Sequence, residues 1–342
     1  MSVSSLWCAP VSAAPAAAAP GPLADFQAQL ALASMHAPGH VAIAVEDVAT
    51  GFETGVNAGL EMPAASTIKI PVMVEVFRQL AAGTFDLNDK MHVTAADRDW
   101  GYGDLCDAPA GKGYTISQLL SLMIDVSDNT ATNMLIRHVG RQRINATMRE
   151  LGLTHTRLAD FIRSDGDGIR WALRSSPADM ARLLTDMAKE QLIDEWSSRA
   201  MIRILRGQKH NSLLPQPLPS GTAIAHKTGT LHDTLNDVGI VYLGEDPYVI
   251  AVMTTDLPTL DAGRSFIRGV SRMAYNALGR FASWREEYGV PGLPAAPASD
   301  APPATPDQRM WTPAQPAPAA PAPAMPAVPS AEALTNGTPQ SR

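Results

Sequence analysis

Stretches with strand character stand at both ends of a long helical block, and this order constrains the fold more than any other feature of the sequence. The expected elements are a helix over 22–36, a β-hairpin over 40–58, a helical pattern from 66 to about 152, a long polar loop over 159–175, a helix over 177–189, strands over 223–228, 237–243 and 248–255, and a helix over 264–286. This order predicts an α+β fold. We expect one antiparallel sheet built from both ends of the chain, flanked by the N- and C-terminal helices, with an all-helical lobe inserted.

Proline and alanine set the limits of the folded domain. Half of the 28 prolines lie within 289–342, a segment that is mostly Ala, Pro, Thr and Gln, and we expect a disordered tail there. Residues 1–22 form an Ala/Pro-rich leader or the remnant of a secretory signal, because Ala13–Ala19 offers small-residue cleavage sites but no basic residue precedes it. Residues 23–288 remain as one domain, long enough to bury a large core.

Composition excludes several classes of function. The net charge is −7 and no Lys or Arg precedes Lys69, so a surface for nucleic acid is not expected. No apolar run reaches the roughly 20 residues of a membrane span. Cys8 and Cys106 are too few for a disulfide framework, and the eight histidines are scattered, which disfavours a zinc hydrolase.

The first candidate site is Ser66-Thr67-Ile68-Lys69, at the start of a helical run. Ser66 and Lys69 are three residues apart and therefore share one face of a helix. Pro71 is tolerated only near a helix start, where free N–H groups favour developing negative charge. A lysine that is neutral in a buried site can take the proton of a serine hydroxyl and make it a nucleophile. By itself this pattern also arises by chance about once in such a chain.

The second candidate, Ser127-Asp128-Asn129, forms a short turn between two predicted helices. An Asp or Asn before a helix is also an ordinary N-cap, and that interpretation suits Asp128 as well as a catalytic role does.

The third candidate, Lys227-Thr228-Gly229-Thr230, ends a predicted strand. A lysine and a hydroxyl at a strand edge can hold a carboxylate, and Gly229 allows the backbone to approach a ligand closely. The alternative is an ordinary strand end with a solvated lysine.

The motifs S-x-x-K, S-D-N and K-T-G, in this order, are shared by class A β-lactamases and penicillin-binding proteins. The chain resembles that superfamily, and class A β-lactamases in particular, over about residues 24–286. The resemblance also includes Thr156-Arg157-Leu158 before the long loop, Ser176–Met180 after it, and Asn236-Asp237 beyond K-T-G.

The resemblance implies a division of roles in acylation. Ser66 would be the acylated nucleophile and Lys69 its general base or part of the proton relay. Ser127 would pass a proton to the departing lactam nitrogen. The backbone N–H groups of Ser66 and Thr230 would form the oxyanion hole, which stabilises the tetrahedral intermediate.

The resemblance also implies how substrate is held. Asn129 would donate to the side-chain amide of the substrate, while Lys227 and Thr228 would bind its carboxylate and Lys227 would also tune Ser127. Tyr102 stands where the family has an aromatic wall beside the cleft, and Trp100 competes for that place. The expected substrate-binding residues are therefore Asn129, Lys227, Thr228, Gly229, Thr230 and Tyr102.

One departure from the family concerns deacylation. Class A enzymes have a glutamate four residues after the T-R-L stretch, and it activates the water that hydrolyses the acyl-enzyme. Here that residue is Ile162, and the loop contains no Glu and no Asn. Asp160, Asp165 and Asp167 are the nearby carboxylates that would have to substitute, unless they are only solvated loop charges.

We therefore expect a serine hydrolase of the class A β-lactamase type, active as a monomer without a metal or other cofactor. Its partner would be a small-molecule β-lactam or a cell-wall peptide. Two alternatives stay open: a D,D-peptidase or penicillin-binding protein with slow deacylation, and a non-catalytic penicillin-binding sensor. This chemistry favours a periplasmic or secreted location.

Overall fold

The computed structural model describes residues 21–164, 172–244 and 246–288, and it has the predicted α+β architecture. Its centre is a five-stranded antiparallel sheet in the order β2-β1-β10-β9-β8. The pairing of β1 with β10 joins the first strand of the chain to the last one, as predicted. The strands are β1 His40–Asp47, β2 Phe52–Val56, β8 Ile224–Thr230, β9 Leu235–Leu243 and β10 Asp246–Thr255.

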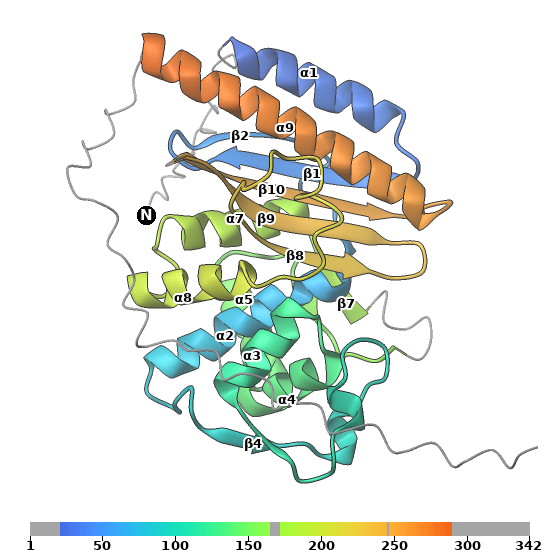
Figure 1. Cartoon of the computed structure of the whole chain (residues 1–342), viewed down its shortest axis with the longest axis vertical. Helices are drawn as coiled ribbons and strands as arrows, with labels where there is room; N and C mark the ends of the chain where they lie inside the picture. The colour runs from blue at the N-terminus through green and yellow to red at the C-terminus, as the bar shows by residue number, and fades with distance from the viewer. Residues whose placement is uncertain (1–20, 165–171, 245, 289–342) are drawn as a thin grey trace, which may run out of the picture.

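Helices α1 (Pro22–Met35) and α9 (Leu260–Tyr288) lie side by side over one face of the sheet (Figure 1). The alternation along β1 separates the two faces of this sheet. Ile43 and Val45 pack with the residues of α1 and α9, whereas Ala42 and Ala44 pack into the core of the helical lobe. Because helices cover both faces, the central strands are buried almost throughout.

The helical lobe packs against the opposite face (Figure 1). Its first helix, α2, follows a 3₁₀ turn over Ala65–Ile68 and is buried along nearly its whole length. The lobe and the helices beneath the sheet comprise α2 Lys69–Ala81, α3 Ile116–Asp125, α4 Asn129–Val139, α5 Arg141–Glu150, α7 Pro177–Ala188 and α8 Glu195–Leu205.

The expectation of a helical pattern over 66–152 is wrong for residues 82–115. This stretch holds a small sheet of β4 (Lys90–His92) and β5 (Gly113–Thr115), joined by irregular chain and 3₁₀ turns. Gly103 and Gly111 adopt φ values of +85° and +78°. These left-handed conformations break a helix and are open chiefly to glycine.

Helix α8 lies in a stretch where no helix is predicted from the sequence. Its signals are local: the Asp194 carboxylate accepts a hydrogen bond from the Ser197 N–H at 2.7 Å, and Ala200, Met201 and Ile204 bury one face. The expected long loop is also shorter than 159–175, because it ends in β7 (Leu173–Ser175). This strand pairs with β6 (Arg157–Leu158) and with β3 (Met62–Pro63).

The terminal segments lie mostly outside the described residues: the expected leader over 1–22 is described only at Gly21 and Pro22, and the expected tail over 289–342 is not described at all. Within the described ranges, no helix is both long enough and apolar enough to cross a membrane. Helix α9 is described up to Tyr288, and near that point Arg285 pairs with Asp47 and Asp246.

Candidate active site

Ser66 lies in the 3₁₀ turn that leads into α2, so it stands at a helix start as predicted. The preceding residue, Ala65, has a φ of +48°, in the left-handed region that residues with a Cβ rarely adopt. Such strain persists only where the surroundings enforce it, and it clusters at functional turns. Here the turn leaves Ser66 half-buried in the wall of a cavity.

Lys69 is fully buried one turn further along. Its Nζ donates to the carbonyl of Ser127 at 2.6 Å, to Ser127 Oγ at 3.0 Å and to Asn129 Oδ1 at 2.7 Å. Among the hydrogen bonds of the described residues, none joins Lys69 Nζ to Ser66 Oγ. Burial, and next the charge of Lys227, hold the pKa of Lys69 well below its usual value, although Asp128 and Asp99 act in the opposite direction. A free amine at this position can accept a proton at neutral pH.

Ser127 occupies the turn between α3 and α4 and has a φ of +59°. This turn places Ser127 Oγ between two buried lysines: Lys69 Nζ is 3.0 Å away and Lys227 Nζ is 3.1 Å away. Two ammonium groups sharing one hydroxyl would repel each other, so the arrangement favours one neutral amine. A hydroxyl between two amines can relay a proton.

Lys227 and Thr228 lie on β8, the edge strand that faces the lobe. Burial, the larger cause, lowers the pKa of Lys227 to about 7, while the carboxylates of Asp237 and Asp125 act in the opposite direction. The lysine therefore sits close to its titration point at neutral pH.

All three motifs meet at one cavity of about 230 Å³. Tyr102 lines this cavity, whereas Trp100, the competing aromatic residue, is 70% exposed and does not. The lining residues are Ser66, Tyr102, Ser127, His210, Ser212, Leu213, Thr228, Thr230, Leu235, Leu260 and Arg264.

Asn129 and Asp128 are both buried, but they do different things. The Asp128 carboxylate accepts from the N–H groups of Ala131 at 2.7 Å and Leu105 at 2.9 Å, so the N-cap interpretation is confirmed for this residue. Asn129 accepts from Lys69 and donates through Nδ2 to Asp99 and Ser164. Its expected contact with the substrate amide stays a prediction, and this contact requires Asn129 to give up one of these hydrogen bonds.

Gly229 packs against the turn that carries Ser66. A Cβ built on Gly229 would lie 2.9 Å from the carbonyl oxygen of Ala64 and 3.2 Å from the backbone nitrogen of Ser66. The glycine therefore lets β8 approach the Ser66 turn closely, while an oxyanion hole formed by the N–H groups of Ser66 and Thr230 stays a prediction.

Gly229→Ala should lower the free energy of unfolding by about 1–3 kcal/mol, because backbone rather than a flexible side chain would have to move. Thermal or denaturant unfolding measures this loss. Gly59→Ala is the matched control, since a Cβ there meets nothing within 4 Å. Equal stability of the two variants would contradict the close approach of β8 to the turn.

Two further residues contribute to the site: Asn236, which the resemblance includes but to which no role is given there, and Arg264, which the sequence does not single out. Asn236, fully buried on β9, donates to the carbonyls of Pro63 at 2.8 Å and Ala64 at 3.1 Å, and so ties the Ser66 turn to the sheet. Arg264, on α9, lines the same cavity as Thr228, and its guanidinium pairs with Asp261. The helical pattern of 264–286 indicates only packing, which is why the sequence alone does not single out Arg264.

The loop that should carry a deacylation base offers none among its described residues. Ile162, at the expected place, is 3% exposed and belongs to the lobe core, and its backbone N–H and carbonyl are both held by the Asn133 side chain. Asp160 is exposed, and its carboxylate accepts from the adjacent Phe161 N–H. Asp165 and Asp167 lie outside the described residues.

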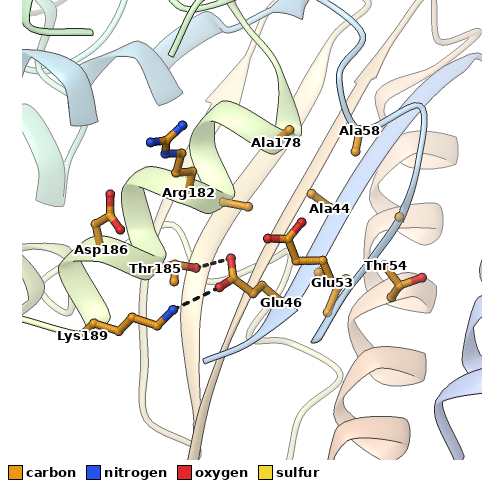
Figure 2. A pocket seen from close by; sticks show the side chains of 13 residues that line it. Ala44, Glu46, Glu53, Thr54, Ala58, Ala178, Arg182, Thr185, Asp186 and Lys189 are labelled. Carbon is orange, nitrogen blue, oxygen red and sulfur yellow. Dashed lines mark hydrogen bonds and ion pairs between the residues drawn. The ribbon is translucent and has the colours of Figure 1, made fainter. Parts of the chain in front are cut away.

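A larger cavity, of about 660 Å³, lies between β1, β2 and α7, away from the three motifs (Figure 2). Glu46 accepts a hydrogen bond from Thr185 at 2.7 Å and pairs with Lys189 at 3.5 Å across it. None of the predicted site residues lines this cavity, so it is separate from the candidate active site. In the part of the chain that the structure describes, no three His, Cys, Asp or Glu side chains are grouped to hold a metal ion.

Comparison with known proteins identifies relatives of the whole domain. A family model described as the β-lactamase enzyme family matches residues 25–278. The structure of PBP-A is 29% identical, with a TM-score of 0.71 over 75% of this chain and 97% of PBP-A. A β-lactamase from Sphaerobacter thermophilus is 31% identical, with a TM-score of 0.69 over 75% of this chain and 97% of the other.

A more distant structure, the TLA-1 extended-spectrum β-lactamase, shares the fold at 20% identity, with a TM-score of 0.70 over 75% of this chain and 98% of its own. The family match covers most of the chain, including all three motifs around the cavity. The chain belongs to the β-lactamase enzyme family.

Proposed function

We propose that this chain is a serine hydrolase that opens β-lactam rings through an acyl-enzyme on Ser66. The observation that carries the proposal is the position of Ser127 Oγ, 3.0 Å from the Lys69 amine and 3.1 Å from the Lys227 amine, beside the cavity that Ser66 lines. This geometry supports a proton path from the nucleophile to a leaving nitrogen.

Acylation proceeds in two linked proton transfers. Ser66 Oγ attacks the lactam carbonyl while its proton passes to the free amine of Lys69, and the backbone N–H groups of Ser66 and Thr230 stabilise the oxyanion. As the C–N bond breaks, Ser127 gives its proton to the nitrogen and regains one from Lys69. The net result is one new Oγ–C bond, one broken C–N bond and one proton moved from Ser66 to nitrogen.

Basic side chains in the cavity lining and next to it suit a substrate carboxylate. Lys227 and Thr228 stand on the edge strand, and Arg264 enters the lining from α9. Penicillins carry such a carboxylate next to the lactam ring. A leucine-to-glutamate variant of PBP-A, 29% identical to this chain, is known as an acyl-enzyme complex with penicillin G, which supports benzylpenicillin as the probe.

Intact-mass spectrometry over time with benzylpenicillin tests the proposal, because it reports acylation and deacylation separately. We expect one adduct per chain, followed by release of product. A stable adduct without any turnover would point to the penicillin-binding sensor. Turnover of D-Ala-D-Ala peptides exceeding that of penicillin would favour the D,D-peptidase. A chain that never gains the mass of penicillin would contradict the proposal.

We expect the second-order rate constant of acylation to fall as the pH rises above about 7. The Lys227 ammonium attracts the substrate carboxylate, its pKa is about 7, and the charged fraction declines as the pH rises through that value. The pH profile of kcat/KM reports the ionisation of the free enzyme, so its alkaline limb measures this decline.

Lys227→Arg is the matching variant, because a guanidinium stays charged up to a pH of about 12. Its alkaline limb should move upward by more than about one pH unit. An unmoved limb would assign the titration to another group.

We also propose that the enzyme acts as a monomer in the periplasm or outside the cell, where its substrates occur, and that it uses no metal or other cofactor. Size-exclusion chromatography with light scattering and fractionation of the producing cells test the first two parts. Retained hydrolysis after dialysis against EDTA tests the third.

A further inference from the structure

A buried carboxylate with no role in the family motifs stands directly behind the active site. Asp99 is 5% exposed and lies in the irregular chain between β4 and β5. Its Oδ1 accepts from Asn129 Nδ2 at 2.7 Å, from Gly101 N at 3.0 Å and from Ser164 Oγ at 2.6 Å, and its Oδ2 accepts from Ser164 N at 2.6 Å. Four donors on one carboxylate indicate a site built for the ionised form.

The charge state of Asp99 follows from these contacts. Burial raises its pKa, but the hydrogen bonds from Ser164, Asn129 and Gly101 outweigh that effect and hold the pKa below its ordinary value. Asp99 is therefore ionised at neutral pH, and an ionised carboxylate only accepts hydrogen bonds.

An acceptor at this place determines which way the Asn129 amide points. With Nδ2 on Asp99, Oδ1 faces Lys69 Nζ at 2.7 Å. The reversed amide would set its oxygen against the Asp99 carboxylate, which is a repulsive contact. It would also turn its NH₂ toward Lys69, where it could donate only to the lone pair with which the free amine must take the proton of Ser66. Ser164 Oγ takes the second Nδ2 hydrogen at 3.0 Å and completes the arrangement.

We propose that Asp99 is a positioning residue for acylation: its carboxylate orients the Asn129 amide so that the amide oxygen holds the amine of Lys69. Asp99 acts through Asn129 and need not touch the substrate. The proposal rests on the function given above, in which Lys69 takes the proton of Ser66.

Three charged groups on neighbouring elements act on the pKa of Lys69. Lys227 on β8, Asp128 at the start of α4 and Asp99 before Tyr102 all act on its charge, and the two carboxylates favour the ammonium form. Removing the charge of Asp99 and the acceptor it orients should therefore make Lys69 harder to protonate.

Asp99→Asn tests the proposal, with the rate constant of benzylpenicillin acylation measured by intact-mass spectrometry. An asparagine at 99 would offer a donor to the amide of Asn129 and permit its reversal. We expect acylation to slow by up to about 100-fold, the scale of a small misplacement of a reacting group. Loss of the charge should also move the acid limb of the pH profile to lower pH, because the free amine of Lys69 then persists further into acid.

Asp97→Asn is the matched control. Asp97 is equally buried, at 1% exposed, and stands two residues earlier, but its carboxylate accepts from Thr94 and Arg137 and touches neither Asn129 nor Lys69. This variant should lose stability yet keep its acylation rate within about 3-fold and its acid limb in place. If both variants slowed acylation to a similar extent and had acid limbs at a similar pH, the proposal would be overturned, since a general loss of structure would explain both results.

A double-mutant cycle separates positioning from structural support. In an Asn129→Ala background, Asp99→Asn should change acylation by less than about 3-fold, because the group through which Asp99 acts is gone. An undiminished effect there, or an acid limb unmoved in Asp99→Asn, would overturn the inference. The limb position does not depend on the folded fraction, so it remains readable in a destabilised variant. An unlabelled wild type would instead refute the proposed function, and this inference with it.

Discussion

Ser66→Ala should abolish covalent labelling by benzylpenicillin, and Lys69→Ala should slow labelling by about 10²- to 10⁴-fold, the usual contribution of a positioned general base. The serine supplies the only bond to the acyl group, so its loss leaves no adduct. The lysine is fully buried and its pKa is held well below the usual value by burial, so we expect it to take the serine proton as a free amine. Intact-mass spectrometry measures both variants against the wild type.

Ser212→Ala is the matched control for the nucleophile, because Ser212 lines the same cavity. It should be labelled at close to the wild-type rate. Peptide mapping should place the adduct on Ser66 in the wild type and in Lys69→Ala. An adduct that persists in Ser66→Ala would refute the assignment of the nucleophile, and equal rates in Lys69→Ala and wild type would remove the lysine from the proton path.

The motifs can be recognised from the sequence because each one occurs in a local context that suits its chemistry. Ser66 stands at a helix start, Ser127 in a turn between helices and Lys227 on an edge strand, and the structure has all three contexts. The strands are likewise predictable, since the alternation in β1 and the strand-forming sequences of β8 to β10 are local signals. The topology then brings the two ends of the chain together.

The contacts that shape the site are not local, and for that reason the sequence does not predict them. Lys69 and Lys227 meet at Ser127 from two different elements, and Asn236 reaches across from β9 to the Ser66 turn. Asp99 lies in an irregular stretch that contains glycines and has no helical or strand periodicity. Nothing in the sequence therefore distinguishes it from a charged residue in an exposed loop. Its role becomes visible only when Asn129 and Ser164 are seen on either side of it.

The hydrolysis of β-lactams by this chain should begin with a burst of one equivalent of product and continue at a much slower steady rate, with acyl-enzyme accumulating. The proposed acylation uses Ser66, Lys69 and Ser127. Ser66 and Ser127 line one cavity, and the buried Lys69 amine contacts Ser127. Deacylation needs a base beside a water, and the place where the family has glutamate holds Ile162, a buried apolar side chain. Without a replacement, deacylation should be slower by about 10²- to 10⁴-fold while acylation is spared.

Stopped-flow absorbance with a chromogenic cephalosporin measures the burst and the steady rate together. Ile162→Glu should raise the steady rate by about 10²-fold or more and shrink the burst, because a carboxylate then stands at the expected place. Ile162→Gln, of the same size but unable to take a proton, is the matched control and should leave deacylation slow. Rapid turnover without a burst in the wild type, lost in Asp160→Asn, Asp165→Asn or Asp167→Asn, would contradict slow deacylation and identify the carboxylate that replaces glutamate. The amplitude of the burst thus decides between an efficient β-lactamase and a penicillin-binding enzyme that releases its product slowly.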